Sequence, residues 1–506
     1  MSKVKNTKIL SLISILLVCV FVFCSCENII RPGTDNGNTP IVLPEKTISL
    51  PYSQSDSLNP YRLTTQLNYD LMPLLYEALY EVDNEFNAKA KLASESKFDH
   101  TKLTVSFTPT DFSDGSPLSV YDIVYSFEKA KASSIYENAL SSFKSAKPVG
   151  KTVVFTLSAP NRNALSLLTF PIIKKDTGNT KDAPIGTGKY KYNAKTNTLD
   201  FNPINNAVIK EVAYISLYDI SDITKLKFNL DMGNISAFTY NLSSYRLSGL
   251  LTNTLKSVSN NLIFLGFNQN NYLAGMFKVR QAAAKAINRS DIASSVYGNN
   301  AVSTFAPFHP YWFECNNLSL PADSTTNDYT VAENLLIEAG FDEINQAGVR
   351  SGEPGILNLS LIVCTDNEYK LSVADAIKAD LNKIGIGVIV HSFDKETYKN
   401  ALLEGNFDMY IGEIKLPNDC SLDAFFTSSG TANYGINIHS TAVESYKKFK
   451  NNEITISEFV SEFIYETPFI PLCYRSNIRA VSTNISVGEI APDNLYADIE
   501  NWTIKE

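Results

Sequence analysis

The chain has 506 residues, and its 53 acidic residues outnumber its 44 basic ones, which gives a formal net charge of −9. This acidic balance argues against nucleic acid as a partner and against electrostatic docking on an anionic membrane. A hydrophobic content of 44% and a charged content of 19% are typical of a globular protein, and the length suffices for two or three domains.

The N-terminus carries an export pattern. Three lysines precede an apolar run at 9–24, which is short for a membrane span, since spanning helices need about 20 residues. Ser25 and Cys26 follow, and this order resembles a bacterial lipoprotein signal. The resemblance implies that residues 1–25 are removed as a signal peptide and that a lipid such as palmitate is attached to Cys26. The alternative is an ordinary N-terminal membrane anchor.

The next part of the chain mixes strand and helix patterns. Residues 26–45 are rich in Gly, Asn, Thr and Pro, which predicts a flexible tether. A short strand is expected at 47–50, and alternating or continuous apolar residues predict further strands at 103–107 and 153–157. Ser119, followed three residues later by an aspartate, is typical of a helix N-cap.

From about residue 262 onward, strand and helix patterns alternate regularly. The predicted strands are 262–267, 359–364, 386–390 and 407–411. The predicted helices are 279–287, 290–298, 330–340, 374–384 and 396–404. Such alternation implies βαβ units and a largely parallel sheet.

Polar loops follow three of the predicted strands. They are 52–56, 268–270 and 412–419. Because open α/β sheets bind ligands beyond the carboxyl ends of their strands, we expect these loops to converge on one cleft. The candidate ligand contacts in them are Gln54, Ser55, Asn268, Asn418 and Asp419. The same residue types are also common in ordinary turns, so each assignment has a purely structural alternative.

Signals of catalysis are missing from the sequence. There is no GxSxG, no HExxH and no Cys–His pairing with local support. The four histidines lie far apart, as do the four cysteines that follow Cys26, so neither a metal site nor a cofactor is expected. Residues 186–189, GTGK, lack the spacing of a phosphate-binding loop and are interpreted as a turn. The sequence therefore favours a binding protein over an enzyme.

Several motifs occur in a fixed order along the chain. The longest, at 112–127, reads FSDGSPLSVYDIVYSF. Shorter ones lie at 58–60, 74–79, 186–190, 277–289, 332–341, 381–388, 405–408 and 468–472. Together they resemble the motifs of family 5 solute-binding proteins, the peptide- and oligopeptide-binding lipoproteins of ABC importers. The matches span about residues 48 to 475.

The resemblance implies a fold and a domain organisation. It predicts an α/β bilobal periplasmic-binding-protein-like fold of class II, with two α/β lobes, a hinge and an α+β subdomain inserted in lobe I. Lobe I would comprise 46–66, 170–262 and 474–506, the inserted subdomain 67–169, and lobe II 263–473.

The resemblance also implies a function. The chain would be a monomeric, lipid-anchored receptor on the extracytoplasmic face of the membrane. It would capture an oligopeptide or dipeptide by lobe closure and deliver it to the permease of an ABC importer. In peptide-binding members, an aspartate in the loop after the strand that holds 405–408 pairs with the α-amine of the ligand. Asp419 is the candidate here, and a register one residue earlier would place the neutral Asn418 there instead.

Three alternatives remain open at this stage. The same fold could bind a non-peptide solute, such as a chelated metal or a sugar, and a capped peptide would suit Asn418 at the anchor position. A surface signalling lipoprotein would keep the fold without transport. A secreted hydrolase would need a nucleophile and a base at the strand-end loops, and the sequence offers neither.

Overall fold

The computed structural model describes residues 47–204, 211–244, 246, 253–321, 327–488 and 494–505. The export pattern, Cys26 and the predicted tether lie outside the described residues, so signal cleavage and lipid attachment stay predictions. Within the described ranges, no helix has the length and apolar character that a membrane crossing requires.

A four-stranded sheet begins the described chain. Its strands, in spatial order, are β1 (Ile48–Tyr52), β10 (Tyr214–Asp219), β9 (Thr198–Phe201) and β8 (Tyr190–Asn193). β1 runs parallel to β10, and the other neighbours are antiparallel. The strand predicted at 47–50 is thus confirmed, and its partners come from segments far along the chain.

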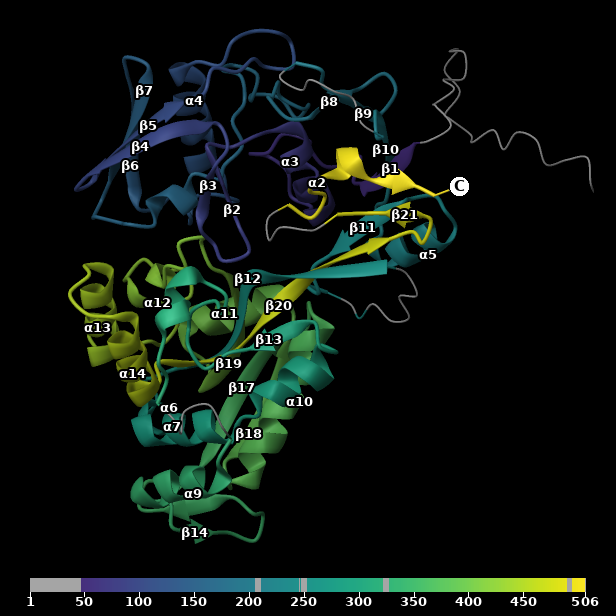
Figure 1. Ribbon diagram of the computed structural model, residues 1–506. Helices are drawn as coiled ribbons and strands as arrows, with labels where there is room; N and C mark the ends of the chain where they lie inside the picture. The colour runs from purple at the N-terminus through teal and green to yellow at the C-terminus, as the bar shows by residue number, and fades with distance from the viewer. Residues whose placement is uncertain are drawn as a thin grey trace, which may run out of the picture. The chain divides into compact units, whose positions relative to one another are not determined.

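A second, antiparallel sheet lies beside the first in Figure 1. It has the order β4 (Ala93–Asp99), β5 (Lys102–Phe107), β7 (Thr152–Leu157) and β6 (Phe143–Val149). Helix α4 (Val120–Lys131) packs against it, and the ring of Phe127 meets that of Phe155 edge-on at 5.5 Å. The predicted N-cap is confirmed, because Asp122 accepts a hydrogen bond from the Ser119 backbone N–H at 2.8 Å. The hairpin of β2 (Tyr80–Val82) and β3 (Ala88–Ala90) adjoins this part.

The largest sheet has seven strands. Six follow one another in the order β11 (Ala237–Tyr240), β20 (Phe469–Val481), β12 (Asn253–Phe267), β19 (Met409–Lys415), β17 (Asn358–Cys364) and β18 (Gly387–Phe393), and β13 (Ala301–Ser303) pairs with β20. Only β18, β17 and β19 are parallel to one another. The expectation of a largely parallel sheet is therefore wrong, because the long strands β12 and β20 enter it antiparallel to each other and β12 also runs antiparallel to β19.

Alternate residues of β12 enter two different hydrophobic cores. Ile263 and Leu265 belong to one core, and Leu262 and Phe264 belong to another, as the two-residue period of a strand dictates. Helices line both faces of the sheet in Figure 1. The first core is closed by α7 (Phe277–Ala286), α9 (Tyr329–Glu338) and α10 (Glu368–Lys383). The second is closed by α11 (Lys395–Glu404), α12 (Asp423–Phe426), α13 (Thr441–Lys450) and α14 (Ile456–Glu466).

The helix ends differ in detail from the sequence prediction. The helix predicted at 330–340 begins one residue earlier, at Tyr329, because Asp328 is the N-cap and accepts a hydrogen bond from Val331 N at 2.9 Å. The helix predicted at 290–298 is α8 (Arg289–Asp291) followed by a π-helical turn.

The remaining elements are short. The helices among them are α2 (Gln66–Asp70), α3 (Met72–Leu75), α5 (Leu226–Asp231) and α6 (Tyr272–Gly275). The strands are β14 (Glu343–Ile344), β15 (Arg350–Gly352), β16 (Gly355–Ile356), β21 (Ile485–Ser486) and β22 (Thr503–Ile504).

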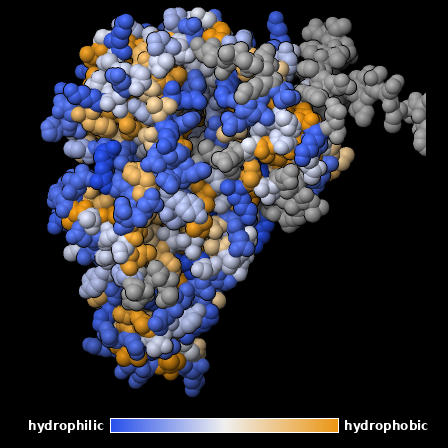
Figure 2. Space-filling view, viewed as in Figure 1, coloured by the Kyte–Doolittle hydropathy of each residue, from blue (hydrophilic) through white to orange (hydrophobic). Residues whose placement is uncertain are grey.

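The β2–β3 hairpin packs into the second core. Phe86 at its turn is buried, and its ring is tilted against that of His309 with the ring centroids 4.6 Å apart; Glu85 O accepts a hydrogen bond from Phe313 N at 3.0 Å. On the face seen in Figure 2, hydrophilic residues predominate and hydrophobic ones are interspersed among them. Most large apolar side chains of the described residues are buried in hydrophobic cores.

Candidate ligand cleft

A cavity of about 650 Å³ lies where three separate parts of the chain meet. One wall is formed by residues 63–66 and Tyr69, a second by residues around 134–139 and 166–169, and a third by residues 413–418. Its volume falls within the range of pockets that hold small molecules and short peptides. The cavity is therefore the candidate ligand site.

A buried asparagine supports the first wall. The side chain of Asn68, on α2, accepts from Ser53 N at 2.8 Å and donates to the carbonyl oxygens of Ser53 and Ser57 at 3.0 Å each. Asp56 accepts from the backbone N–H groups of Thr64 and Thr65 at 2.8–3.0 Å. Because buried polar groups with all their hydrogen bonds made are rigid, this network fixes α2 and the residues just before it beside the cavity.

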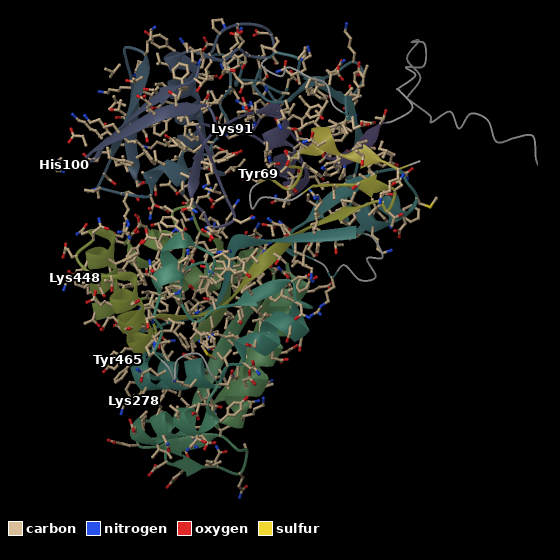
Figure 3. The ribbon with its side chains drawn as sticks, in the orientation of Figure 1. Tyr69, Lys91, His100, Lys278, Lys448 and Tyr465 are labelled. Carbon is tan, nitrogen blue, oxygen red and sulfur yellow. The ribbon has the colours of Figure 1, made fainter. Side chains whose placement is uncertain are left out.

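The third wall is the end of β19 and the loop that follows. Glu413 and Lys415 lie on the same side of this strand, two residues apart. Glu413 is paired with Arg475 at 2.6 Å, and the ammonium group of Lys415 lies 5.2 Å from the ring centroid of Tyr69, a residue labelled near the middle of the chain's upper part in Figure 3. A cation over an aromatic face is an attractive arrangement, so Lys415 is held against the first wall.

Asp70 interacts electrostatically with Lys415. Its burial raises the pKa of its carboxyl from the ordinary 3.8 to about 6, against the opposing effects of hydrogen bonds from Thr239 and Gln66 and of the nearby Lys415. Gln66 Nε2 donates to Asp70 at 2.6 Å, and Thr239 donates through its hydroxyl. The carboxyl therefore takes up its proton at a higher pH in the folded protein than in the unfolded chain.

This shift predicts a pH dependence of stability. Because the folded state binds the proton more tightly, the contribution of Asp70 is most favourable below pH 4 and is lost as the pH rises from about 4 to about 6. We expect the difference in free energy of unfolding between wild type and Asp70→Asn to change by roughly 2 kcal/mol over this interval, in favour of the variant at pH 7. Denaturant unfolding of both proteins at pH 4 and pH 7 measures this, and a pH-independent difference would contradict it.

Asn418 and Asp419 are neighbours in sequence but face different spaces. Asn418 lines the large cavity and donates to the Thr169 hydroxyl at 3.4 Å. Asp419 lines a separate cavity of about 40 Å³ and accepts hydrogen bonds from Asn161 Nδ2 at 2.8 Å and Ser421 N at 3.0 Å. The cavity that Asp419 lines is therefore much smaller than the one that Asn418 lines.

The backbone explains this division. Cys420 N donates to Pro417 O at 2.9 Å, which closes a tight turn over Asn418 and Asp419, and Cys420 has a left-handed φ of +53°. Burial raises the pKa of the Asp419 carboxyl, against the hydrogen bond from Asn161. The arrangement places a neutral amide in the large cavity and the carboxyl outside it.

The three predicted loops do not all meet. Asn268 directly follows β12, which is antiparallel to β19. Phe267 is therefore paired with Met409 at one end of the ladder, and Asn261 is paired with Lys415 at the other. Asn268 therefore lies at the opposite end of this ladder from Lys415, and its expected convergence with Asn418 and Asp419 is wrong. Gln54 and Ser55 are exposed residues in the loop that supports the first wall. Whether any of these five residues binds a ligand stays a prediction.

The surroundings of Asn268 are those of a structural residue. Its amide donates to Gly405 O at 3.0 Å, and its side-chain oxygen accepts from Asn270 N at 3.2 Å. We expect Asn268→Ala to lower the free energy of unfolding by about 1–3 kcal/mol, because buried partners lose their hydrogen bonds, and to leave ligand affinity unchanged. Thermal unfolding and calorimetric titration with a bound ligand test this, and a loss of affinity with full stability would restore the original assignment.

Several cavity residues were not singled out by sequence reasoning. Thr169, Tyr136 and Tyr69 belong to segments without a strand-end position, and Lys415 was only part of a longer loop. The first three carry no local signal of ligand binding, because they become neighbours only through packing of distant segments. Lys415 could have been found as the first basic residue after the apolar part of β19.

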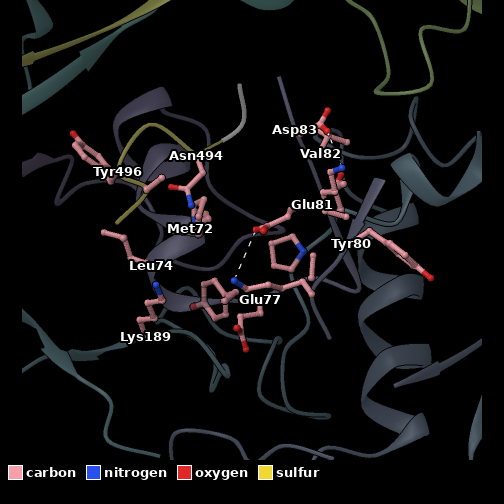
Figure 4. Close-up of a pocket in the computed structure, with 18 of the residues that line it drawn as sticks. Met72, Leu74, Glu77, Tyr80, Glu81, Val82, Asp83, Lys189, Asn494 and Tyr496 are labelled. Atoms are coloured by element: carbon pink, nitrogen blue, oxygen red, sulfur yellow. Dashed lines mark ion pairs between the residues drawn. The ribbon is translucent and has the colours of Figure 1, made fainter. Parts of the chain in front are cut away.

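A second cavity, of about 440 Å³, adjoins the first and shares Tyr69, Tyr136 and Thr169 with it. Its lining is charged: Lys91 pairs with Glu81 at 3.9 Å, the contact dashed in Figure 4, and Lys189 pairs with Glu500. The burial of Glu77 in this cavity raises the pKa of its carboxyl. The candidate site thus extends from a largely neutral chamber into a charged one.

Residues 89–433 match the family described as bacterial extracellular solute-binding proteins, family 5 (Middle). The chain belongs to this family. This match confirms the family that the sequence motifs predicted. Because the family consists of solute-binding proteins, the chain is not an enzyme.

Curated relatives of this family 5 protein are named for peptide binding. The oligopeptide-binding protein AppA of Bacillus subtilis is 23% identical over 497 residues, which is 87% of this chain and 88% of that protein. Proteins of Brucella ovis and Brucella abortus that are named as ABC transporter peptide-binding proteins are 26% identical over 352 residues. The chain spans 64% of the length of these Brucella relatives.

Solved structures confirm the predicted bilobal α/β fold. AppA of Bacillus subtilis, in complex with a nonapeptide, is 20% identical and superposes with a TM-score of 0.65 over 91% of this chain and 99% of that one. NikZ of Campylobacter jejuni, in complex with Ni(L-His), is also 20% identical, with a TM-score of 0.66 over 91% and 100% of the two chains. One fold thus holds different ligands in these two proteins.

Proposed function

We propose that this chain is the extracytoplasmic solute-binding component of an ABC importer and that it captures peptides. The observation that carries the proposal is the 650 Å³ cavity, whose walls come from three separate parts of the chain. Family membership and the names of the curated relatives support it. A cavity of this size accommodates a short peptide, and its hydroxyl and amide side chains suit backbone hydrogen bonding.

Capture would occur by closure of two lobes. In this proposal, lobe I comprises 46–66, 170–262 and 474–506 and carries the inserted subdomain 67–169, and lobe II comprises 263–473. The β12–β20 ladder is irregular between Val258 and Leu262, close to the proposed boundary, which makes it the candidate hinge.

Part of the contact between the inserted subdomain and lobe II is polar. It includes the Asn161–Asp419 hydrogen bond, the Arg162–Glu314 ion pair and the Asn163–Glu314 hydrogen bond of 2.7 Å. Such polar contacts separate at a lower free-energy cost than an apolar core, whereas Phe86 of the β2–β3 hairpin is buried in the second core and would have to move with lobe II. Closure over a ligand would exclude water and strengthen the ligand's hydrogen bonds.

The loaded protein would then deliver its ligand to the transmembrane subunits of the importer. The energy of transport would come from the importer's ATPase. The protein would act as a monomer, held at the extracytoplasmic face of the membrane by a lipid on Cys26. Mass spectrometry of the intact protein purified from membranes tests the lipid: a mass increase on a fragment that begins at Cys26 is expected.

The ligand is tested by mass spectrometry of small molecules released when the purified protein is denatured. We expect a set of peptides. The matched control is Thr169→Trp, which should release no peptides, because its indole fills the edge that the two cavities share. A single non-peptide compound from wild type would replace the proposal by the alternative in which the same fold carries another solute.

A further inference from the structure

Another cavity, of about 390 Å³, lies in the part of the chain that contains the seven-stranded sheet. Its walls come from α7 and α9, which cover one face of the sheet, from α14, which covers the other, and from the start of β20. Phe469 of β20 pairs with Gly266, so the cavity lies near the Met409 end of the β12–β19 ladder and away from Lys415. Among the described residues, it shares no lining residue with the two cavities of the candidate cleft, and its volume is within the range of small-molecule pockets.

The lining of this cavity is mostly apolar, and its charged groups have one sign. The apolar side chains include Phe305, Val331, Leu335, Ile464 and Tyr465. Gln281 and Thr467 line it too, and each donates a hydrogen bond to a backbone oxygen of the protein. Two cations, Lys285 and Arg289, complete the lining, to which no acidic residue of the described ranges contributes. Lys285 has interactions of its own, so only Arg289 is considered as an anchor for a ligand.

Arg289 is a buried cation for which the described part of the chain provides no acidic partner. Only 4% of its surface is exposed. Its Nε donates to Pro471 O at 2.9 Å, its Nη1 donates to Ala284 O at 2.8 Å, and its guanidinium lies 4.5 Å from the centre of the Phe305 ring. Burial lowers the pKa of this group to about 9, and no carboxylate of the described residues offsets that effect. Arg289 is therefore still charged at neutral pH, and a charge buried without a counter-ion is costly.

Arg280, on α7, shows how the same region satisfies an arginine that serves the fold alone. All three of its guanidinium nitrogens donate to backbone oxygens, Nε to Thr467 O, Nη1 to Gly275 O and Nη2 to Glu466 O. The carboxylate of Glu466 also favours its charged form. Arg289 uses only two of its five N–H donors in this way, and its Nη2 donates to no described residue. Arg289 thus lines the cavity with both a charge and donors that a ligand can use.

We propose that this cavity is a second binding site, for a small carboxylate with an apolar body. The carboxylate accepts hydrogen bonds from Arg289, and the apolar body contacts Leu335 and Ile464. A guanidinium and a carboxylate form short, charge-assisted hydrogen bonds, and burial of the apolar body adds to the affinity. Free fatty acids and acylated hydrophobic amino acids both have this chemistry. The site needs neither a peptide nor lobe closure, so it is independent of the proposed function.

The test is calorimetric titration of the purified protein with two sets of carboxylates. One arm uses straight-chain acids from hexanoate to dodecanoate, and the other uses N-acetylated leucine and phenylalanine. Each acid is compared with its uncharged counterpart, the alcohol of the same length or the amidated amino acid. Wild type is expected to bind the acids about tenfold more tightly or better, because only they pair with the guanidinium. The arm that binds more tightly identifies the source of the carboxylate.

Two substitutions and a matched control complete the test. Arg289→Gln is expected to remove the preference for acids. Leu335→Trp leaves the arginine in place and fills the cavity, so it should weaken binding of acids and uncharged counterparts alike by about tenfold or more. Ile337→Trp, at an exposed residue of α9 outside the cavity, is the control and should bind as wild type does. Unfolding temperatures establish that each variant is folded, and Leu335→Trp keeps the test decisive if Arg289→Gln is not.

Three results would overturn this inference. Equal affinity for acids and their uncharged counterparts, or a preference that survives in folded Arg289→Gln, would remove Arg289 as the anchor. Acid binding that Leu335→Trp leaves unchanged would place the ligand elsewhere on the protein. Binding of no compound in either arm would mean that the cavity is not a ligand site. None of these results bears on peptide capture, which the released peptides and Thr169→Trp test at a separate cavity.

Discussion

Thr169→Trp is expected to lower ligand affinity by at least about 100-fold while the protein stays folded. Thr169 is half-buried, its hydroxyl accepts a hydrogen bond from Asn418, and it lines both adjoining cavities. An indole at this position would occupy the space where the two chambers meet. It would also remove the Thr169 hydroxyl to which Asn418 donates, and a ligand would then have to displace the ring or give up its own contacts.

Two measurements decide this prediction. Calorimetric titration with a peptide recovered from the wild-type protein gives the affinity, and the melting temperature reports whether the variant is folded. Thr108→Trp, at an exposed residue of the same part of the chain, is the matched control and should bind as wild type does. Wild-type affinity in a folded Thr169→Trp protein would show that ligands bind elsewhere.

The fold was predictable wherever local pattern decides it. The N-cap of α4 can be predicted from Ser119 and Asp122 alone, and the C-terminal part of strand β12 can be predicted from the apolar run at 262–267. Strand direction was not predictable in this way. It depends on pairing between β12 and β20, which lie far apart in the sequence, and nothing in either strand's own residues distinguishes an antiparallel from a parallel partner.

The candidate site was only partly predictable for the same reason. The loop that ends in Asn418 and Asp419 was found from its position after a strand, and it does form one wall of the large cavity. Which of the two side chains enters that cavity depends on a single turn at Pro417–Cys420. The opposite walls come from residues without any strand-end signal, and Asn268 was misplaced because the rule for parallel sheets was applied to an antiparallel strand.

A glycine in the 186–190 motif is expected to have the largest effect on stability. Gly188 N donates to Leu75 O at 3.1 Å, and a Cβ atom on Gly188 would lie 2.3 Å from the Leu75 carbonyl carbon and 2.5 Å from Leu74 O. These are backbone atoms of α3 and cannot rotate away. We therefore expect Gly188→Val to lower the free energy of unfolding by about 3 kcal/mol or more, as overpacking against a fixed backbone does.

Denaturant unfolding of Gly188→Val and of a control glycine variant measures this effect. Gly150→Ala is the control, since Gly150 has a φ of +60° with no heavy atom within 4 Å of its added Cβ, and backbone strain alone should cost about 1–2 kcal/mol there. Equal losses in the two variants would mean that close approach to α3 is unimportant. A larger loss at Gly188 would explain why the motifs at 74–79 and 186–190 occur together: their backbones touch, and Leu74 and Tyr76 next to this contact line the charged chamber of the cleft.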